Sequence, residues 1–347
     1  MTLTSAAVVP LLAAAAAFGQ PYTIDSVAGG ALSAPMAIRG PQALALDAAG
    51  NLYFATQNHL VFRRDAASGA ISVVAGTSSP GFSGDNGPAV KAQLRNPSGL
   101  AVDASGDLYI ADSGNARVRK VAKGIITTVA GGGSVLGDGG PATKAELQNP
   151  AGLAIGPSGD LYICDSQDNR VRRVSTRGVI TTIAGTGSPT PVYHGDTSPA
   201  ATAELNSPNG IALSAAGDFY IAELGGDRIR KVSGETISTF AGNGQEGFAG
   251  DDGPAIKAPL CNPYGIAVDS AGAVYVADFC NTRIRKIVNG VIATIAGSGT
   301  GGFSGDKGPA TAAQLTIPEA VAVDSKGRVY VADTGNDRVR VLIPAAP

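Results

Sequence analysis

The chain has 347 residues, with 28 Asp and Glu against 26 Lys and Arg, so its formal net charge of −2 provides no large positive field for holding a nucleic acid backbone. It contains 48 Gly and 21 Pro but only two His and no Trp. Because the Gly and Pro recur at fixed places between apolar segments, the composition indicates a turn-rich all-β protein and argues against a helical or a disordered one.

The first 19 residues are small and apolar, and they end in Ala17-Phe18-Gly19, a small-x-small pattern that suits a signal peptidase. We expect residues 1–19 to be a signal peptide and the protein to be secreted or periplasmic. The alternative is a short apolar leader without a targeting role, because no Lys or Arg precedes Arg39. A membrane span is not expected, since a span needs about 20 apolar residues and Pro10 interrupts this run.

One unit is repeated almost to the end of the chain, which predicts a single repeat domain over residues 20–347 in place of two separate domains. A proline opens each of its six copies. These prolines are Pro41, Pro97, Pro150, Pro208, Pro263 and Pro318.

Each unit contains four predicted strands, which in the second copy are GLAVD (99–103), LYIAD (108–112), RVRKV (117–121) and ITTVAG (126–131). The turn from Asp103 to Asp107 has the acid and the glycine that a short hairpin requires. Its spacing also resembles a calcium loop, but the later ligands of an EF-hand are missing. Four antiparallel strands per unit predict one blade of a β-propeller.

The segment YIADSGNARVRKV, the following ITTVAG and the loop GFSGDNGPA resemble NHL repeats, especially those of bacterial secreted proteins and of the teneurin propeller. The resemblance covers about residues 22–342 and implies a six-bladed β-propeller. Blade 1 departs from the pattern, because its segment 55–59 is two residues shorter and lacks the acid and the first arginine.

The fourth strand is expected at 71–76, 126–131, 180–185, 237–242 and 292–297, but none follows the sixth unit. Residues 23–29, TIDSVAG, match the missing strand. We therefore predict that this N-terminal strand completes blade 6 and closes the ring without an unpaired edge.

Several residue types recur in every blade, and a repeated column is more simply a packing layer than six copies of a site. Six tyrosines on the second strands form one such column. An acid at the end of the second strand and an arginine five residues later are predicted to form structural ion pairs across the loop. The pairs are Asp112 with Arg117, Asp165 with Arg170, Glu223 with Arg228, Asp278 with Arg283, and Asp333 with Arg338. The alternative, a ring of arginines that binds anions, is opposed by the acids.

The long loops between blades carry a second repeated acid, followed by Pro-Ala, that we interpret as the cap of a short helix with Pro in its first turn. These acids are Asp85, Asp138, Asp196, Asp251 and Asp306. An aromatic residue precedes most of them and is expected to anchor each loop onto its own blade. We expect no metal site here, because the ring of blades would hold the acids apart.

Departures from the repeat indicate where function lies, since symmetric positions are explained by the fold. The loop 188–195 is longer than its counterparts and contains Tyr193 and His194, and His59 lies in the shortened loop of blade 1. Loops after the second and fourth strands leave the same face, so these three residues are candidate ligand contacts there. Ordinary loop residues are the alternative, and the two histidines are on non-adjacent blades.

Cys261 precedes and Cys280 follows the paired strands 265–269 and 273–278, and in the register of that hairpin the two cysteines are one residue away from being directly opposite. They are predicted to form a disulfide, as suits an exported protein, with two unbonded cysteines as the alternative. Cys164 replaces an alanine of other blades and is expected to be a buried free thiol.

No nucleophile with a base and no metal-ligand spacing is apparent, so we identify no catalytic residue, metal or cofactor. The first hypothesis is a monomeric, non-enzymatic recognition propeller for a protein, glycan or small-molecule ligand. The alternative is a metal-dependent lyase or lactonase, as some related propellers are, although the inner strands contain no His. RNA binding, a third possibility, is opposed by export and by the charge.

Overall fold

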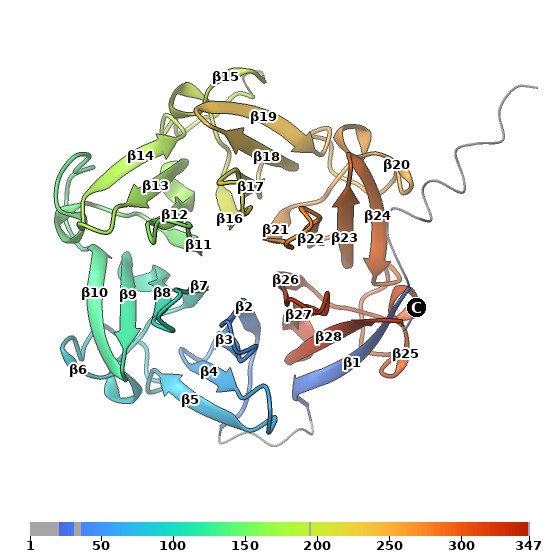
Figure 1. Cartoon of the computed structure of the whole chain (residues 1–347), viewed down its shortest axis with the longest axis horizontal. Helices are drawn as coiled ribbons and strands as arrows, with labels where there is room; N and C mark the ends of the chain where they lie inside the picture. Colours follow the sequence, from blue (N-terminus) through green and yellow to red (C-terminus); the bar gives the residue numbers. More distant parts are fainter. Residues whose placement is uncertain (1–20, 31–35, 194–195, 346–347) are drawn as a thin grey trace, which may run out of the picture.

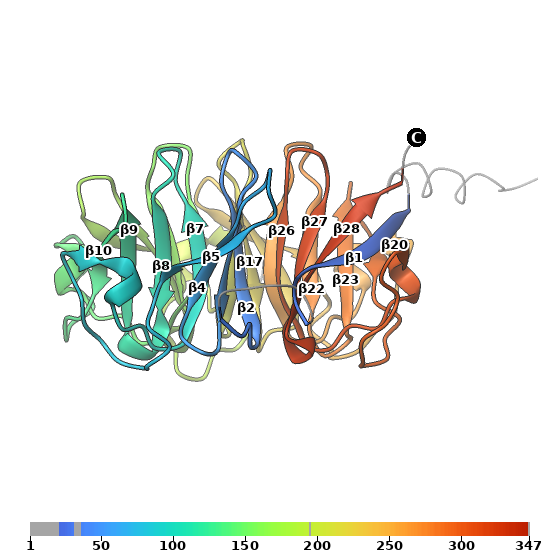
Figure 2. The same cartoon turned by 90° about the horizontal axis from the view of Figure 1, so that it is seen from below.

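The computed structural model describes residues 21–30, 36–193 and 196–345, so the predicted signal peptide and His194 lie outside the described residues. Six antiparallel sheets stand around a common axis, one for each repeated unit (Figure 1). The side view shows a flat disc (Figure 2). The predicted six-bladed β-propeller is confirmed.

Each blade has four main strands, numbered here from the axis outward. The inner strands are β2 Pro41–Leu46, β7 Pro97–Val102, β11 Pro150–Ile155, β16 Pro208–Leu213, β21 Pro263–Val268 and β26 Pro318–Val323. The second strands are β3 Leu52–Thr56, β8 Leu108–Asp112, β12 Leu161–Asp165, β17 Phe219–Glu223, β22 Val274–Asp278 and β27 Val329–Asp333. The third strands are β4 Val61–Arg64, β9 Arg117–Ala122, β13 Arg170–Val174, β18 Arg228–Ser233, β23 Arg283–Val288 and β28 Arg338–Pro344.

The outer strands are β5 Ile71–Ala75, β10 Ile125–Gly131, β14 Ile180–Ala184, β19 Thr236–Ala241, β24 Val291–Ala296 and β1 Tyr22–Gly29. Two-residue strands add to the outer edge of four sheets: β6 Gly87–Pro88, β15 Ser198–Pro199, β20 Gly253–Pro254 and β25 Gly308–Pro309. Short 3-10 turns occupy the loops: η1 Ala89–Lys91, η2 Ser113–Asn115, η3 Ala142–Lys144, η4 Ser166–Asp168, η5 Ala200–Thr202, η6 Ala255–Lys257, η7 Ala310–Ala312 and η8 Thr334–Asn336.

The ring closes between the two ends of the chain. Strand β1 pairs antiparallel with β28 from Tyr22 opposite Pro344 to Gly29 opposite Arg338, and β25 covers its other edge. In Figure 1 the blue β1 lies beside the red β28. The prediction that residues 23–29 complete blade 6 is confirmed.

The disc has two different faces. Loops that follow the second and fourth strands leave what we call the loop face, whereas the hairpins that join strands one and two, and three and four, form the hairpin face, at the top of Figure 2. The hairpin turns are as expected: Gly106 has φ +82°, and the Asp103 carboxylate accepts hydrogen bonds from the backbone N–H groups of Ser105 and Asp107.

The predicted acid–arginine pairs need a correction. Asp112 does lie opposite Arg117 in the strand register, but its carboxylate pairs with Arg119, two residues further, at 3.3 Å. Arg119 is fully buried and so requires a charged partner, whereas Arg117 is partly exposed and donates to the carbonyl of Asn115 at 2.9 Å. The same second arginine is buried in five blades: Arg119, Arg172, Arg230, Arg285 and Arg340.

The loop acids are the other partners of these buried arginines. Asp85 lies 2.6 Å from Arg119 and does not cap the short turn η1, whose N-cap residue is Pro88 without a side-chain hydrogen bond. The aromatic residue of the loop, Phe82, stacks on Arg117 at 4.1 Å, so this loop is anchored on the following blade and not on its own. The same contact is made by Tyr193 with Arg228, Phe248 with Arg283, and Phe303 with Arg338. The loop acids and aromatic rings therefore join neighbouring blades.

Cys261 and Cys280 form the predicted disulfide with a Cα–Cα distance of 5.3 Å, and Cys164 is the buried free cysteine that was expected.

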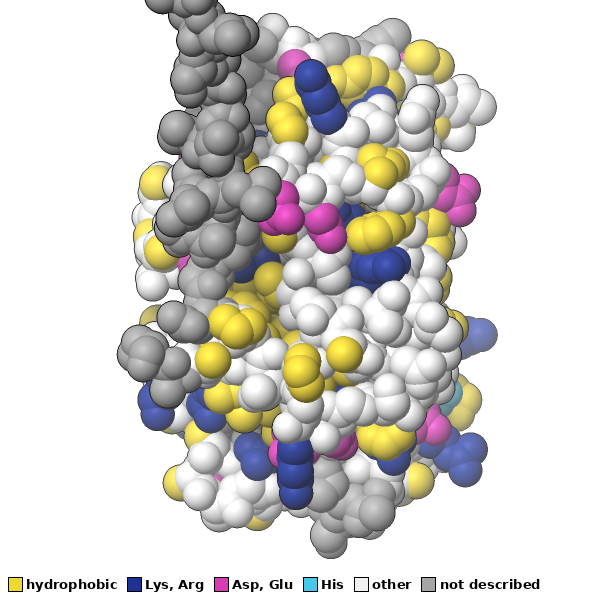
Figure 3. Space-filling model, turned by 90° about the vertical axis from the view of Figure 1, so that its right-hand side faces the viewer, with side chains coloured by type: hydrophobic (Ala, Val, Ile, Leu, Met, Phe, Trp, Pro, Cys, Tyr) yellow, Lys and Arg dark blue, Asp and Glu magenta, His cyan; other side chains and the backbone are white. Residues whose placement is uncertain are grey.

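Over blades 5 and 6 the rim carries acidic and basic side chains mixed with apolar and uncharged ones (Figure 3). Within the described part of the chain, no helix is long and apolar enough to cross a membrane.

Candidate ligand-binding site

The residue after each opening proline lies around the axis near the loop face. We call this set the axial ring: Gln42, Ser98, Ala151, Asn209, Tyr264 and Glu319. Apart from Ala151, these residues and the two that follow the ring position in each inner strand line a cavity of about 60 Å³ on the axis. The rest of the inner strand is repeated in all blades, so the axial ring is the position at which the six blades differ most.

The inner strands approach one another closely beneath the axial ring. A Cβ atom on Gly99 would lie 1.8 Å from the carbonyl oxygen of Ala151 in the next blade, and one on Gly210 would lie 2.4 Å from that of Tyr264. Glycine is therefore required there for the strands to pack. Because the strands approach so closely, the cavity at the axial ring is small.

On the side of blades 1 and 2, the polar groups of the axial ring are used by the fold. The Gln42 amide donates to the carbonyl of Pro97 at 2.9 Å, and the Ser98 hydroxyl pairs with Ser113. In blade 6 the Thr334 hydroxyl likewise donates to the carbonyl of Pro41 at 2.6 Å. These contacts join adjacent blades.

On the side of blades 4 to 6 the ring is different. Leu224 and Phe279 stand where blades 2 and 6 have Ser113 and Thr334, so the corresponding hydroxyl contact between blades is absent. The Phe279 ring stacks on Tyr264 with centroids 5.7 Å apart, and the Asn209 side chain lies beside the Tyr264 hydroxyl. An aromatic and amide surface thus borders the axis here.

Glu319 completes this side of the ring. Its carboxylate has no hydrogen bond or ion pair with any described residue, and burial raises its pKa to about 7. Burial, with the nearby carboxylate of Glu319, also raises the pKa of Tyr264 to about 12. An unpaired, half-buried acid beside a tyrosine and an amide can accept hydrogen bonds from a ligand that enters from the loop face.

The loop residues proposed from sequence lie elsewhere. His59 has φ +64°, and its Nδ1 accepts a hydrogen bond from the backbone N–H of Asn96 at 3.2 Å, while burial, with Arg95 nearby, lowers its pKa. Tyr193 stacks on Arg228 at 4.0 Å, as the other aromatic residues of the loops between blades stack on theirs. His194 lies outside the described residues, so ligand contacts by these three side chains stay predictions.

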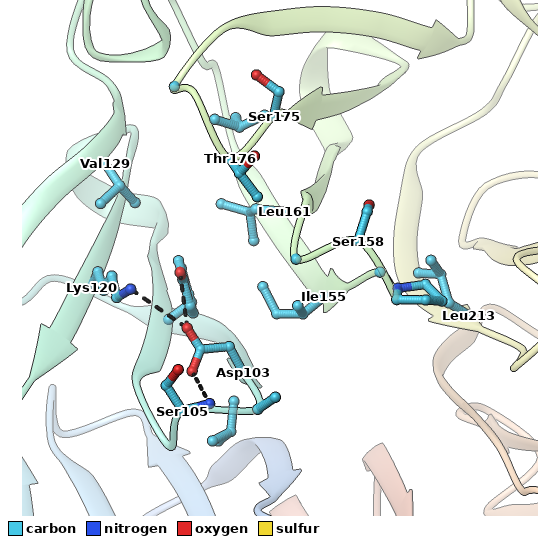
Figure 4. A pocket seen from close by; sticks show the side chains of 18 of the residues that line it. Asp103, Ser105, Lys120, Val129, Ile155, Ser158, Leu161, Ser175, Thr176 and Leu213 are labelled. Carbon is cyan, nitrogen blue, oxygen red and sulfur yellow. Dashed lines mark hydrogen bonds and ion pairs between the residues drawn. The ribbon is translucent and has the colours of Figure 1, made fainter.

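A larger cleft, of about 1020 Å³, opens between blades 2 and 3 on the hairpin face (Figure 4). Its charged groups satisfy one another: Lys120 lies 2.8 Å from Asp107 and 3.5 Å from Asp103, which also accepts from Tyr109. Size alone therefore does not make it the better site. We call it the 2/3 cleft.

One cluster in the described part of the chain has three groups that could ligate a metal: Glu246, Cys261 and Cys280. Both sulfur atoms are in the disulfide, which leaves one carboxylate. In this oxidised form the cluster is not a metal site.

The sequence interpretation missed the axial ring, although a signal was present. Position two of the inner strand is occupied by Gln, Ser, Ala, Asn, Tyr and Glu in turn, between a proline and a small residue that hardly vary. That variation marks a position freed from the demands of the repeat.

The comparisons with known proteins agree with the fold and with the repeated motifs. The model of the Teneurin NHL domain matches residues 3–122, 80–136, 131–192 and 243–304, and the NHL repeat model matches residues 315–342. The chain belongs to the Teneurin NHL domain family. Human Teneurin-4 is 28% identical to it over 344 residues, which cover 87% of this chain and 12% of Teneurin-4. This NHL propeller thus spans only a small part of that relative.

Solved structures of both binding proteins and enzymes share the fold. An auxiliary nutrient binding protein from Bacteroides thetaiotaomicron superposes with a TM-score of 0.67 at 16% identity, covering 93% of this chain and 76% of its own. A streptogramin B lyase superposes with a TM-score of 0.56 at 17% identity, covering 93% of this chain and 98% of its own. At such identities the likeness concerns the fold alone, which binding proteins and enzymes have in common.

Proposed function

We propose that this NHL propeller is an exported, non-enzymatic recognition protein that binds a small ligand rich in hydroxyl or amine groups at the axial ring of the loop face. The observation that carries the proposal is the unpaired carboxylate of Glu319 beside Tyr264 and Asn209. Hydroxyl and ammonium groups donate hydrogen bonds to such a carboxylate and pack against aromatic rings. The disulfide and the apolar residues 1–19 support export.

A metal-dependent lyase or lactonase is the competing function, since such enzymes share the fold. The axial ring supplies a single carboxylate and no His, whereas catalytic metal sites need about three protein ligands. This donor set favours recognition over metal catalysis.

Thermal denaturation of the purified protein with a panel of monosaccharides, amino acids and polyamines tests the proposal. We expect at least one compound to raise the melting temperature, and we expect Glu319→Gln and Tyr264→Ala to abolish that rise. Ser98→Ala, in the same ring but on the side used by the fold, is the matched control and should keep the rise. A rise that survives both variants would place the ligand elsewhere, and a stoichiometric divalent metal in elemental analysis would overturn the non-enzymatic assignment.

A further inference from the structure

Near the hairpin face, most blades carry a row of three side chains in register across strands two, three and four. In blade 2 the row is Tyr109, Lys120 and Thr127, and in blade 3 it is Tyr162, Arg173 and Thr181. Directly opposed residues on paired strands project from the same face of a sheet. Each row therefore forms one wall of the cleft between its blade and the next.

In blades 1, 2 and 4 the base of this row is neutralised by an acid of the adjoining hairpins. Lys120 lies 2.8 Å from Asp107, Lys231 lies 2.7 Å from Asp218, and Arg63 lies 3.1 Å from Asp65. The tyrosine of the row is satisfied as well in blades 1, 2 and 5, where its hydroxyl donates to the first acid of the hairpin. The dashed contacts of Asp103 in Figure 4 show this arrangement.

Blade 3 breaks the pattern at one residue. Gly156 stands where blade 2 has Asp103, and a Cβ atom there would lie 2.9 Å from the Tyr162 ring. The nearest acid to Arg173 is Asp160, at 3.9 Å, and that carboxylate already accepts a hydrogen bond from the backbone of Thr176. The first acid of the hairpin is thus absent from blade 3, and the second, Asp160, lies further from Arg173 than the matching Asp107 lies from Lys120.

The whole row of blade 3 is consequently without hydrogen-bond partners among the described residues. The guanidinium of Arg173 makes no hydrogen bond, and its side chain is 43% exposed. No hydrogen bond is formed by the Tyr162 hydroxyl, and the buried Thr181 hydroxyl has no partner either. The guanidinium of Arg173, whose one ion pair is long, and the Tyr162 hydroxyl are therefore available side by side, with the buried Thr181 hydroxyl behind them.

These three groups line a cleft of about 550 Å³ between blades 3 and 4, which we call the 3/4 cleft. Phe219 and Pro199 provide an apolar wall, and the ring of Phe219 lies 5.8 Å from that of Tyr162. Glu235, on the turn after β18, is the acid of the lining and forms no ion pair with Arg173. The volume suits a ligand of one to a few sugar residues.

We propose that the 3/4 cleft binds an acidic sugar, with Arg173 on its carboxylate and the Tyr162 hydroxyl on one of its hydroxyl groups. A guanidinium pairs with a carboxylate through two parallel hydrogen bonds, and unsatisfied hydroxyls complement a polyhydroxylated ring better than a peptide side chain. The site lies on the opposite face from the axial ring and does not depend on the function proposed there.

Titration calorimetry with a galacturonic acid trimer tests this site, with maltotriose and a glutamic acid tripeptide as comparison ligands. We expect the trimer to bind, and Arg173→Gln to weaken binding about ten-fold or more through loss of a charged hydrogen-bonded pair. Lys120→Gln is the matched control, because it removes the equivalent base of the 2/3 cleft, and Glu319→Gln is the control for the axial ring. Neither should change the affinity.

Several results would overturn the proposal. Absence of binding by the wild-type protein would remove the site, and an equal loss in Lys120→Gln would place the ligand in the 2/3 cleft. Equal affinity for maltotriose would mean that the carboxylate is not recognised. Equal affinity for the glutamic acid tripeptide would show that the cleft recognises carboxylates without preferring sugars.

Discussion

The rim and the axis of this propeller follow opposite rules. On the rim the same buried arginine recurs in five blades, and in each of them it contacts a loop acid or a loop carbonyl of the preceding segment. At the axis six different residues occupy one position, and Glu319 has no described partner. The repeated contacts stabilise the ring, whereas the varied ones are free to serve binding, often at the expense of stability. Substitutions can test each half of this comparison.

The largest effect on stability is expected where the ring closes, at the pairing of β1 with β28. Deleting residues 22–29 removes β1 and exposes the edges of β28 and β25, so the last blade loses its outer strand. We expect the cooperative melting transition to be lost or to fall by tens of degrees in circular dichroism, in the range that follows when many contacts are removed together. Deleting residues 1–19 alone is the control and should leave the melt unchanged. An unaltered melt after the larger deletion would contradict closure by β1.

Substitution of a buried arginine should cause the next largest loss in the free energy of unfolding. Arg119→Ala leaves the buried carboxylate of Asp112 without its positive partner, which typically costs about 3–5 kcal/mol, whereas Arg117→Ala removes a partly exposed group and should cost about 1 kcal/mol. Urea unfolding of both variants measures the difference in the free energy of unfolding. Equal losses, or a larger loss for Arg117→Ala, would favour the pairing expected from sequence over the one in the structure.

Arg117 and Arg119 also show which features of the structure could not be predicted from the sequence. The period of the repeat was enough to predict the blades, the closing strand and the Cys261–Cys280 disulfide, because each depends only on strand order and register. It could not choose between Arg117 and Arg119, since residues i and i+2 of a strand share a face and only burial distinguishes them. The axial ring was not predicted because its residues differ from blade to blade, and the unpaired carboxylate of Glu319 and the long contact between Arg173 and Asp160 depend on side-chain distances that no repeat alignment contains.

The Cys261–Cys280 disulfide should stabilise the loop face near the axial ring, and its removal tests this contribution. Replacing both Cys261 and Cys280 with Ser should lower the free energy of unfolding by about 3 kcal/mol, because the bridge closes a loop with a sequence separation of 19 residues. Non-reducing peptide mapping of the wild-type protein should find the two residues linked. Cys164→Ala, which restores the alanine of the other blades, is the control and should change stability little. Two free thiols at positions 261 and 280 would refute the bridge.

The smallest expected effect is a gain in the free energy of unfolding, and it comes from a substitution at the axis. Burial raises the pKa of Glu319 to about 7, above its value of about 4.3 in an unfolded chain, so its contribution to stability is fully present below pH 4 and is lost as the pH rises through 7. Glu319→Gln mimics the neutral acid. It should therefore raise the free energy of unfolding by about 1–3 kcal/mol at pH 8 and change it little at pH 4.

Urea unfolding of the wild type and Glu319→Gln at several pH values measures this difference, with Glu235→Gln, at an exposed turn, as the control that should show no pH-dependent gain. A gain that grows with pH, together with loss of ligand binding in the same variant, would mean that the ring retains an ionisable group at the expense of stability. A loss of stability at pH 8 would instead mean that Glu319 is paired in solution and belongs with the rim contacts, as part of the scaffold.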